Sequence, residues 1–317
     1  MSFELRQDES LRKGVRRIVR KEMEYALKQV ARTSNGSRDE AVHEIRKCFK
    51  KVRAILRLVR PAISERNYRY ENTMFRNAAR PLTEVRDAKI LVETVDKVAK
   101  HFADRVRGHQ FAVVRKELMT HQREVRKRVL DAENAFAVVE TAVREALERL
   151  DGWANIPNRW WSIGNGVQQV YRQARQAFVY ANVDPTATKL HEWRKQAKYL
   201  RYQLEILRAI WPEMMEPLAG QADHLGELLG DDHDLVVLRQ MLTQHPKCFG
   251  GEKGLELLFA LIDRRRKELE GEATLLGHRL FLDSPRDFAC RLKGYWTVWR
   301  KLGEPDHVEV ALGDVHT

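Results

Sequence analysis

The stretch HEIRKCFKKVR at residues 43–53 reappears 148 positions later as HEWRKQAKYLR at residues 191–201. The two copies share the pattern H-E-x-R-K-x-x-K-x-x-R without a gap. Flanking features recur in the same order, with Gly14-Val15 and Gly166-Val167 before the two copies and Arg86-Asp87 and His233-Asp234 after them. A match of this extent indicates that the chain consists of two copies of one structural unit.

Nearly every long segment of both copies shows the 3.6-residue periodicity of an amphipathic helix, and none shows strand alternation, so an all-α fold is predicted. The expected helices cover residues 11–32, 39–60 (capped by Asp39), 65–80, 85–104, 109–131, 134–150, 163–181, 186–210, 213–229, 233–244, 252–270 and 285–302. The strongest boundary signal is DGWANIPN at residues 151–158. This places a first helical repeat at residues 1–151, a second at residues 152–305 and a C-terminal tail at residues 306–317.

Charge is unevenly distributed along the 317-residue chain, whose formal net charge is +12. Residues 1–150 carry +13, whereas residues 151–317 carry −1. A hydrophobic content of 43% supports a folded core and excludes general disorder. The excess positive charge predicts an acidic or phosphorylated partner.

On a helix, the charged residues of each repeated stretch fall on one face, opposite the apolar residues. The first cationic stripe comprises His43, Arg46, Lys47, Lys50, Arg53 and Arg57, and the second comprises His191, Arg194, Lys195, Lys198 and Arg201. A solvated surface is the alternative interpretation, but like charges four residues apart repel, and an ordinary surface would intersperse acids. The stripes therefore predict a polyanion site. Arginines of the preceding helices are secondary candidates, namely Arg16, Arg20, Arg172 and Arg175.

Other classes of site find little support. The residues three and four positions after His43 and His191 are Arg or Lys, which would repel a metal ion, so a phosphate contact or a structural histidine is expected instead. The nucleotide-binding and hydrolase motifs GxxxxGK[ST], GxGxxG and GxSxG do not occur, so neither cofactor nor catalytic centre is expected. The acidic cluster at residues 231–234 is interpreted as a helix N-cap, and the basic run at residues 264–267 as a solvated helix end.

The ends and the cysteines favour a cytoplasmic location. Residues 1–10 lack the apolar run of a signal peptide, and no apolar stretch is long enough to span a bilayer. Cys48, Cys248 and Cys290 are widely separated, so no disulfide framework is expected.

At the histidine-led basic stretches the sequence resembles the CHAD domain family (conserved histidine α-helical domain), over roughly residues 8–305. Arg86-Asp87 is similar to the "RD" element of that family, and His233-Asp234 differs from it by having His in place of Arg. The resemblance implies two helical bundles related by a pseudo-two-fold axis around a basic central channel. It also implies binding of inorganic polyphosphate, with targeting to polyphosphate granules in some members. Many members are fused to a CYTH triphosphate-tunnel domain, but its ExExK motif does not occur here, so the chain is expected to be a stand-alone CHAD protein.

The leading hypothesis is therefore non-enzymatic binding of polyphosphate. Arginines would act as forked donors, lysines as mobile point charges and the two histidines as pH-sensitive donors. A nucleic-acid-binding protein, an enzyme acting on phosphorylated substrates and a pure scaffold are the alternatives.

Overall fold

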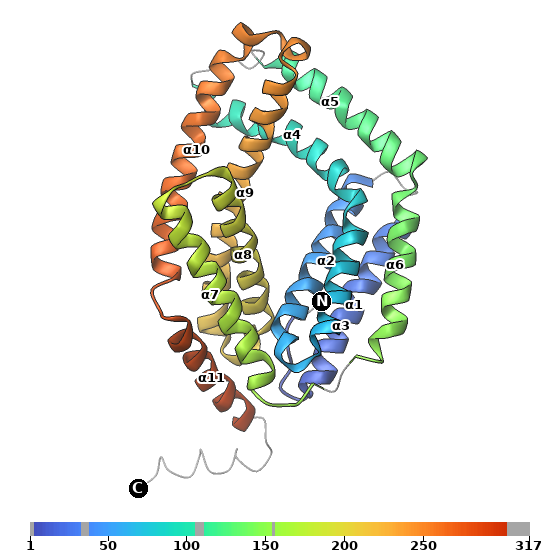
Figure 1. Cartoon of the computed structure of the whole chain (residues 1–317), viewed down its shortest axis with the longest axis vertical. Coiled ribbons are helices and arrows are strands. Elements are labelled where there is room, and N and C mark those ends of the chain that lie inside the picture. Colours follow the sequence, from blue (N-terminus) through green and yellow to red (C-terminus); the bar gives the residue numbers. More distant parts are fainter. Residues whose placement is uncertain (1–2, 33–37, 105–110, 154–155, 303–317) are drawn as a thin grey trace.

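The computed structural model describes residues 3–32, 38–104, 111–153 and 156–302. Within these ranges the chain consists of helices joined by short loops and contains no strand, which confirms the all-α prediction (Figure 1). The predicted tail at residues 306–317 lies outside the described residues. In the described ranges, no helix is long and apolar enough to cross a membrane.

Eleven α-helices are described. The first half of the chain supplies α1 (Leu11–Ala31), α2 (Arg38–Val59), α3 (Glu65–Ala79), α4 (Pro81–His101), α5 (Ala112–Arg126) and α6 (Ala135–Leu150). The second half supplies α7 (Trp161–Val183), α8 (Ala187–Ile206), α9 (Pro212–Gln244), α10 (Glu252–Leu280) and α11 (Pro285–Leu302). The two repeated stretches lie on α2 and α8, and each of these helices is followed by a short 3-10 turn, at Arg60–Ala62 and Arg208–Ile210.

Local sequence explains where several helices begin. The side-chain oxygens of Ser10, Ser64 and Thr186 each accept a hydrogen bond from the backbone amide three residues later, which caps α1, α3 and α8. Pro81 and Pro212 occupy the first position of α4 and α9, where the missing amide hydrogen costs nothing.

The apolar faces of α2 and α8 anchor the cationic stripes in the core. On α2, the ring of Phe49 lies 5.6 Å from that of Phe75 in α3. On α8, the indole of Trp193 lies 5.1 Å from the ring of Phe178 in α7. Burial of such a side chain stabilises the fold by about 1.5–3 kcal/mol. The stripes are therefore held on helices whose orientation is set by packing.

Three sequence-based predictions of helix limits are wrong. Helix α9 runs without a break from Pro212 to Gln244, so the acidic cluster at residues 231–234 lies inside a helix and is not an N-cap. Helix α10 extends to Leu280, which places the basic run at residues 264–267 in mid-helix. Asp39 lies in the first turn of α2, which begins at Arg38, and does not cap it.

Tertiary partners explain the continuity of α9. The carboxylate of Asp232 is almost completely buried and accepts a hydrogen bond of 2.7 Å from the Nε of Arg266 in α10. Gly230 packs against the guanidinium of Arg194 in α8. Features that mark a boundary in an isolated sequence are thus used here for contacts between helices.

The halves α1–α6 and α7–α11 lie on two sides of the centre of the molecule and meet at two places (Figure 1). At one of them the guanidinium of Arg57 in α2 lies 3.8 Å from the ring centroid of Tyr199 in α8. Gly166 of α7 approaches the carbonyl of Leu58 so closely that a Cβ atom would collide with it. At the other, the Nζ of Lys97 in α4 lies 2.7 Å from a carboxylate oxygen of Asp231 in α9. The division into repeats at residue 151 stays a prediction.

Candidate anion-binding site

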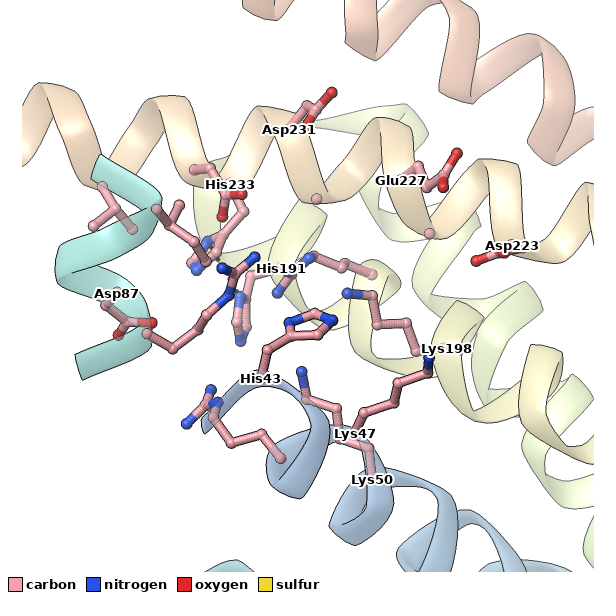
Figure 2. Close-up of a pocket in the computed structure, with 18 of the residues that line it drawn as sticks. His43, Lys47, Lys50, Asp87, His191, Lys198, Asp223, Glu227, Asp231 and His233 are labelled. Atoms are coloured by element: carbon pink, nitrogen blue, oxygen red, sulfur yellow. Dashed lines mark hydrogen bonds between the residues drawn. The ribbon is translucent and has the colours of Figure 1, made fainter. Parts of the chain in front are cut away.

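A cavity of about 740 Å³ lies between α2, α4, α8 and α9, which are drawn from both halves of the chain (Figure 2). The two repeated stretches, far apart in sequence, face this same space. Predicted residues that line it are His43, Arg46, Lys47, Lys50, His191, Arg194, Lys198 and Arg201. Helix α4 adds Arg86 and Lys97, and α9 adds His233. The structure therefore brings most of the two cationic stripes together.

Lys50 of α2 and Lys198 of α8 approach each other across the cavity. Burial lowers the pKa of Lys50 well below its usual range, and the nearby charges of Lys198, Arg46 and Arg194 lower it further. Burial and the charge of Arg194 likewise lower the pKa of Lys198 to about 8. In the described part of the chain, neither ammonium group makes a hydrogen bond or a salt bridge to another side chain. Both shifts show that the surroundings of the two ammonium groups disfavour their positive charges.

Two arginines extend this cluster of cations. Arg46 of α2 donates a hydrogen bond to the hydroxyl of Thr83, which lies two positions into α4. Arg194 of α8 lies over the backbone of α9 at Gly230, and its Nε is shielded from solvent without a hydrogen-bond partner among the described residues. Burial lowers the pKa of both guanidinium groups. An arginine with a free donor in such a place is suited to an anionic oxygen.

The histidines are close neighbours of these cations. His191 of α8 and His233 of α9 lie with their Nδ1 atoms 3.3 Å apart and their ring centroids 4.4 Å apart. Burial, followed by the charge of Arg194, lowers the pKa of His233 to about 4. Burial also lowers the pKa of His43 and His191, so all three rings are neutral at neutral pH. They can then donate or accept hydrogen bonds at the cavity wall without adding charge.

Five carboxylates also line the cavity, a feature that the sequence interpretation missed. They are Asp87 of α4 and, on α9, Asp223, Glu227, Asp231 and Asp234. Figure 2 shows three of the α9 carboxylates along that helix, on the side of the site opposite Lys47 and Lys50. The spacing of Asp223, Glu227 and Asp231, four residues apart, could have revealed a shared helix face, but not what that face meets.

Three residues of the predicted stripes lie outside the cavity lining. The side chains of Arg53 and Arg57 both donate to Oδ1, the side-chain amide oxygen of Asn72 in α3, at 3.0 Å. Lys195 forms an ion pair with Glu192 on its own helix. Because α2 and α8 approach each other toward the C-terminal end of α2, Arg53 and Arg57 meet neighbouring helices before they reach the cavity (Figure 1).

The four secondary arginines also lie elsewhere. Arg16 donates to the carbonyl oxygen of Trp153 at 3.3 Å, and Arg20 forms a 2.9 Å ion pair with Asp151. Arg172 donates to Gln169 at 2.9 Å, and Arg175 donates to the carbonyl oxygen of Phe281 at 3.1 Å. These contacts hold segments of the fold together and give no support to a role in binding.

The fold and the cavity define an all-α protein with a central cationic pocket shared by two helical halves. The family model of the CHAD domain matches residues 17–243, and the chain therefore belongs to the CHAD domain family. Three chains among solved structures match this one. One is the crystal structure of the CHAD domain from the plant Ricinus communis, with 16% identity and a TM-score of 0.56, covering 87% of this chain and 90% of that one. No curated protein matches the chain.

Proposed function

We propose that the chain binds linear inorganic polyphosphate in the cavity between α2, α4, α8 and α9, without catalysing a reaction on it. The observation that carries the proposal is the position of Lys50 and Lys198, two cations from different halves that line the same cavity and make no hydrogen bond or ion pair with a side chain of the described residues. A polyanion would offer anionic oxygens to both ammonium groups at once. The family resemblance points to the same ligand.

A chain of phosphates suits the spread of these cations better than one phosphate. Donors come from four helices around a cavity of about 740 Å³, so a single phosphate cannot reach all of them. Arg46 and Arg194 would each hold phosphate oxygens through forked donors, and Lys47, Lys50 and Lys198 would follow the chain as mobile charges. The neutral rings of His43 and His191 would add hydrogen bonds.

Binding can be tested by titrating the protein with long-chain polyphosphate at several salt concentrations. Affinity should fall as salt rises, because each ion pair formed releases counterions. Lys50→Met should reduce affinity by at least about tenfold. Lys195→Met, which removes an equal charge from a position outside the cavity, should have little effect. Equal losses in the two variants, or no salt-dependent binding at all, would refute the proposal.

Two further measurements separate the alternatives. Displacement of polyphosphate by DNA or RNA at equal phosphate concentration would favour a nucleic-acid ligand. Release of phosphate from polyphosphate or a triphosphate, lost on replacement of His43 and His191 by alanine, would favour an enzyme. A fluorescent fusion tests the proposed cytoplasmic location and association with polyphosphate granules, which should require Lys50.

A further inference from the structure

The two sides of the cavity carry opposite balances of charge, although the repeated stretches on α2 and α8 are alike. The wall from α2 and α4 presents Arg46, Lys47, Lys50, Arg86 and Lys97 against the single carboxylate of Asp87. The wall from α8 and α9 presents Arg194, Lys198 and Arg201 against Asp223, Glu227, Asp231 and Asp234. The formal balance is thus four positive charges on the first wall and one negative charge on the second.

Two carboxylates of α9 form ion pairs with cations that line the cavity. Asp223 forms an ion pair with Arg201, and Asp231 forms one with Lys97 at 2.7 Å. Glu227 lies between these two on the same helix face, and its side chain is 71% exposed. An anionic ligand that spreads across the cavity would meet this carboxylate row and would have to compete with it for Arg201 and Lys97.

We infer that Asp223, Glu227 and Asp231 determine selectivity, by keeping the anionic ligand among the cations of α2, α4 and α8, away from α9, and rejecting polyanions that need the full width of the cavity. This inference rests on the proposed function and concerns which polyanions are excluded from the cavity. A polyphosphate chain consists of phosphates alone and can lie along the cations of α2, α4 and α8. A single-stranded nucleic acid carries a sugar and a base on each phosphate, so it must extend toward α9, where repulsion between like charges opposes it.

The carboxylate row can be neutralised without a large change of shape. Glu227→Gln removes one charge and leaves both interhelical ion pairs in place. The triple variant Asp223→Asn/Glu227→Gln/Asp231→Asn removes the row. Glu216→Gln is a matched control, because Glu216 lies on α9 outside the cavity, seven residues before Asp223, and its side chain is 69% exposed.

The measurement is the ratio of affinities for long-chain polyphosphate and single-stranded DNA, at equal phosphate and salt concentrations. We expect Glu227→Gln to shift this ratio toward DNA by about threefold and the triple variant by about tenfold. Glu216→Gln should leave it unchanged. Thermal unfolding identifies any variant that is misfolded. If the triple variant is misfolded, the affinity ratio of Glu227→Gln alone tests the inference.

If Glu227→Gln bound polyphosphate and single-stranded DNA more tightly by the same factor, the effect would be one of net charge, and the inference would be overturned. An equal change of the ratio in Glu216→Gln, or no change in either variant, would also overturn it. These outcomes differ from failure of the proposed function, which the wild-type protein would show by not binding polyphosphate.

Discussion

Replacing Lys198 by methionine should stabilise the ligand-free protein and weaken polyphosphate binding at the same time. Lys198 is partly buried beside Arg194, and its stem lies over α9 at Gly226. Burial and the charge of Arg194 lower its pKa from the usual 10.5 to about 8. Methionine is similarly long and unbranched, so it keeps the contact with α9 and removes the charge.

The pKa of Lys198 sets the size of the expected effect. A change from 10.5 to about 8 corresponds to about 3 kcal/mol at neutral pH, at about 1.4 kcal/mol for each tenfold change in the protonation equilibrium. Water in the cavity screens part of this penalty. We therefore expect Lys198→Met to raise the free energy of unfolding by about 1–3 kcal/mol at pH 7.

The pH dependence of this gain has a defined sign. Between pH 8 and 10.5 the unfolded chain binds a proton at Lys198 that the folded protein does not, so the free energy of unfolding of the wild type rises with pH across this window. The methionine variant lacks this rise. The difference in free energy of unfolding between the variant and the wild type should therefore be largest below about pH 8 and should decline toward pH 10.5.

Urea unfolding at several pH values measures this difference, and polyphosphate titration of the same samples measures binding. Lys195→Met serves as the control, since that residue is exposed, is paired with Glu192 and lies outside the cavity. Lower stability of Lys198→Met than of the wild type at pH 7 would refute the reasoning. A stability gain that does not decline at high pH would refute the role assigned to charge.

Three further predictions concern other parts of the molecule. Gly166→Ala should lower the free energy of unfolding by about 1–3 kcal/mol in urea unfolding, because its Cβ would collide with the carbonyl of Leu58 where the two halves meet. Asp232→Asn should lower it by about 1–2 kcal/mol, because Arg266 would lose its buried charged partner and keep only Glu270. Polyphosphate affinity, titrated at constant salt, should decrease as pH rises through about 8, where Lys198 loses its proton.

Each of these predictions has a clear contrary result. Gly220→Ala is the control for Gly166→Ala, because its Cβ would meet no atom within 4 Å and alanine favours the helix by about 1 kcal/mol. Equal effects of the two glycine substitutions would contradict the close approach of α7 to α2. Unchanged stability of Asp232→Asn would show that the pair with Arg266 contributes little. A pH-independent affinity would exclude Lys198 as a contact of the ligand.

The cationic stripes could be predicted because they depend on local sequence alone. Helical periodicity places Arg46 and Lys50 on one face of α2, and the repeat places Arg194 and Lys198 on the equivalent face of α8. Periodicity does not predict which residues of a stripe line the cavity and which contact a neighbouring helix. That limit depends on the convergence of α2 with α8, which directs Arg57 onto the ring of Tyr199.

The rest of the site depends on how helices pair in space. His233 meets His191 only because α9 packs against α8, and no spacing in the sequence encodes that contact. The continuity of α9 could not be foreseen either. Gly230 and the neighbouring acids are typical of a helix boundary, but here Asp232 finds a partner in Arg266, 34 residues away.

A repeated motif does not by itself make a symmetric site, because the charge of a wall also depends on what packs around the motif. Beside His43 lies Arg86, a permanent cation, whereas beside His191 lies His233, whose pKa of about 4 leaves it neutral at neutral pH. The carboxylates of α9 reduce the positive charge of the second wall further. A net charge of +12 therefore describes the cavity poorly. The arrangement of charge across the cavity determines which polyanions can enter, and in what position they lie.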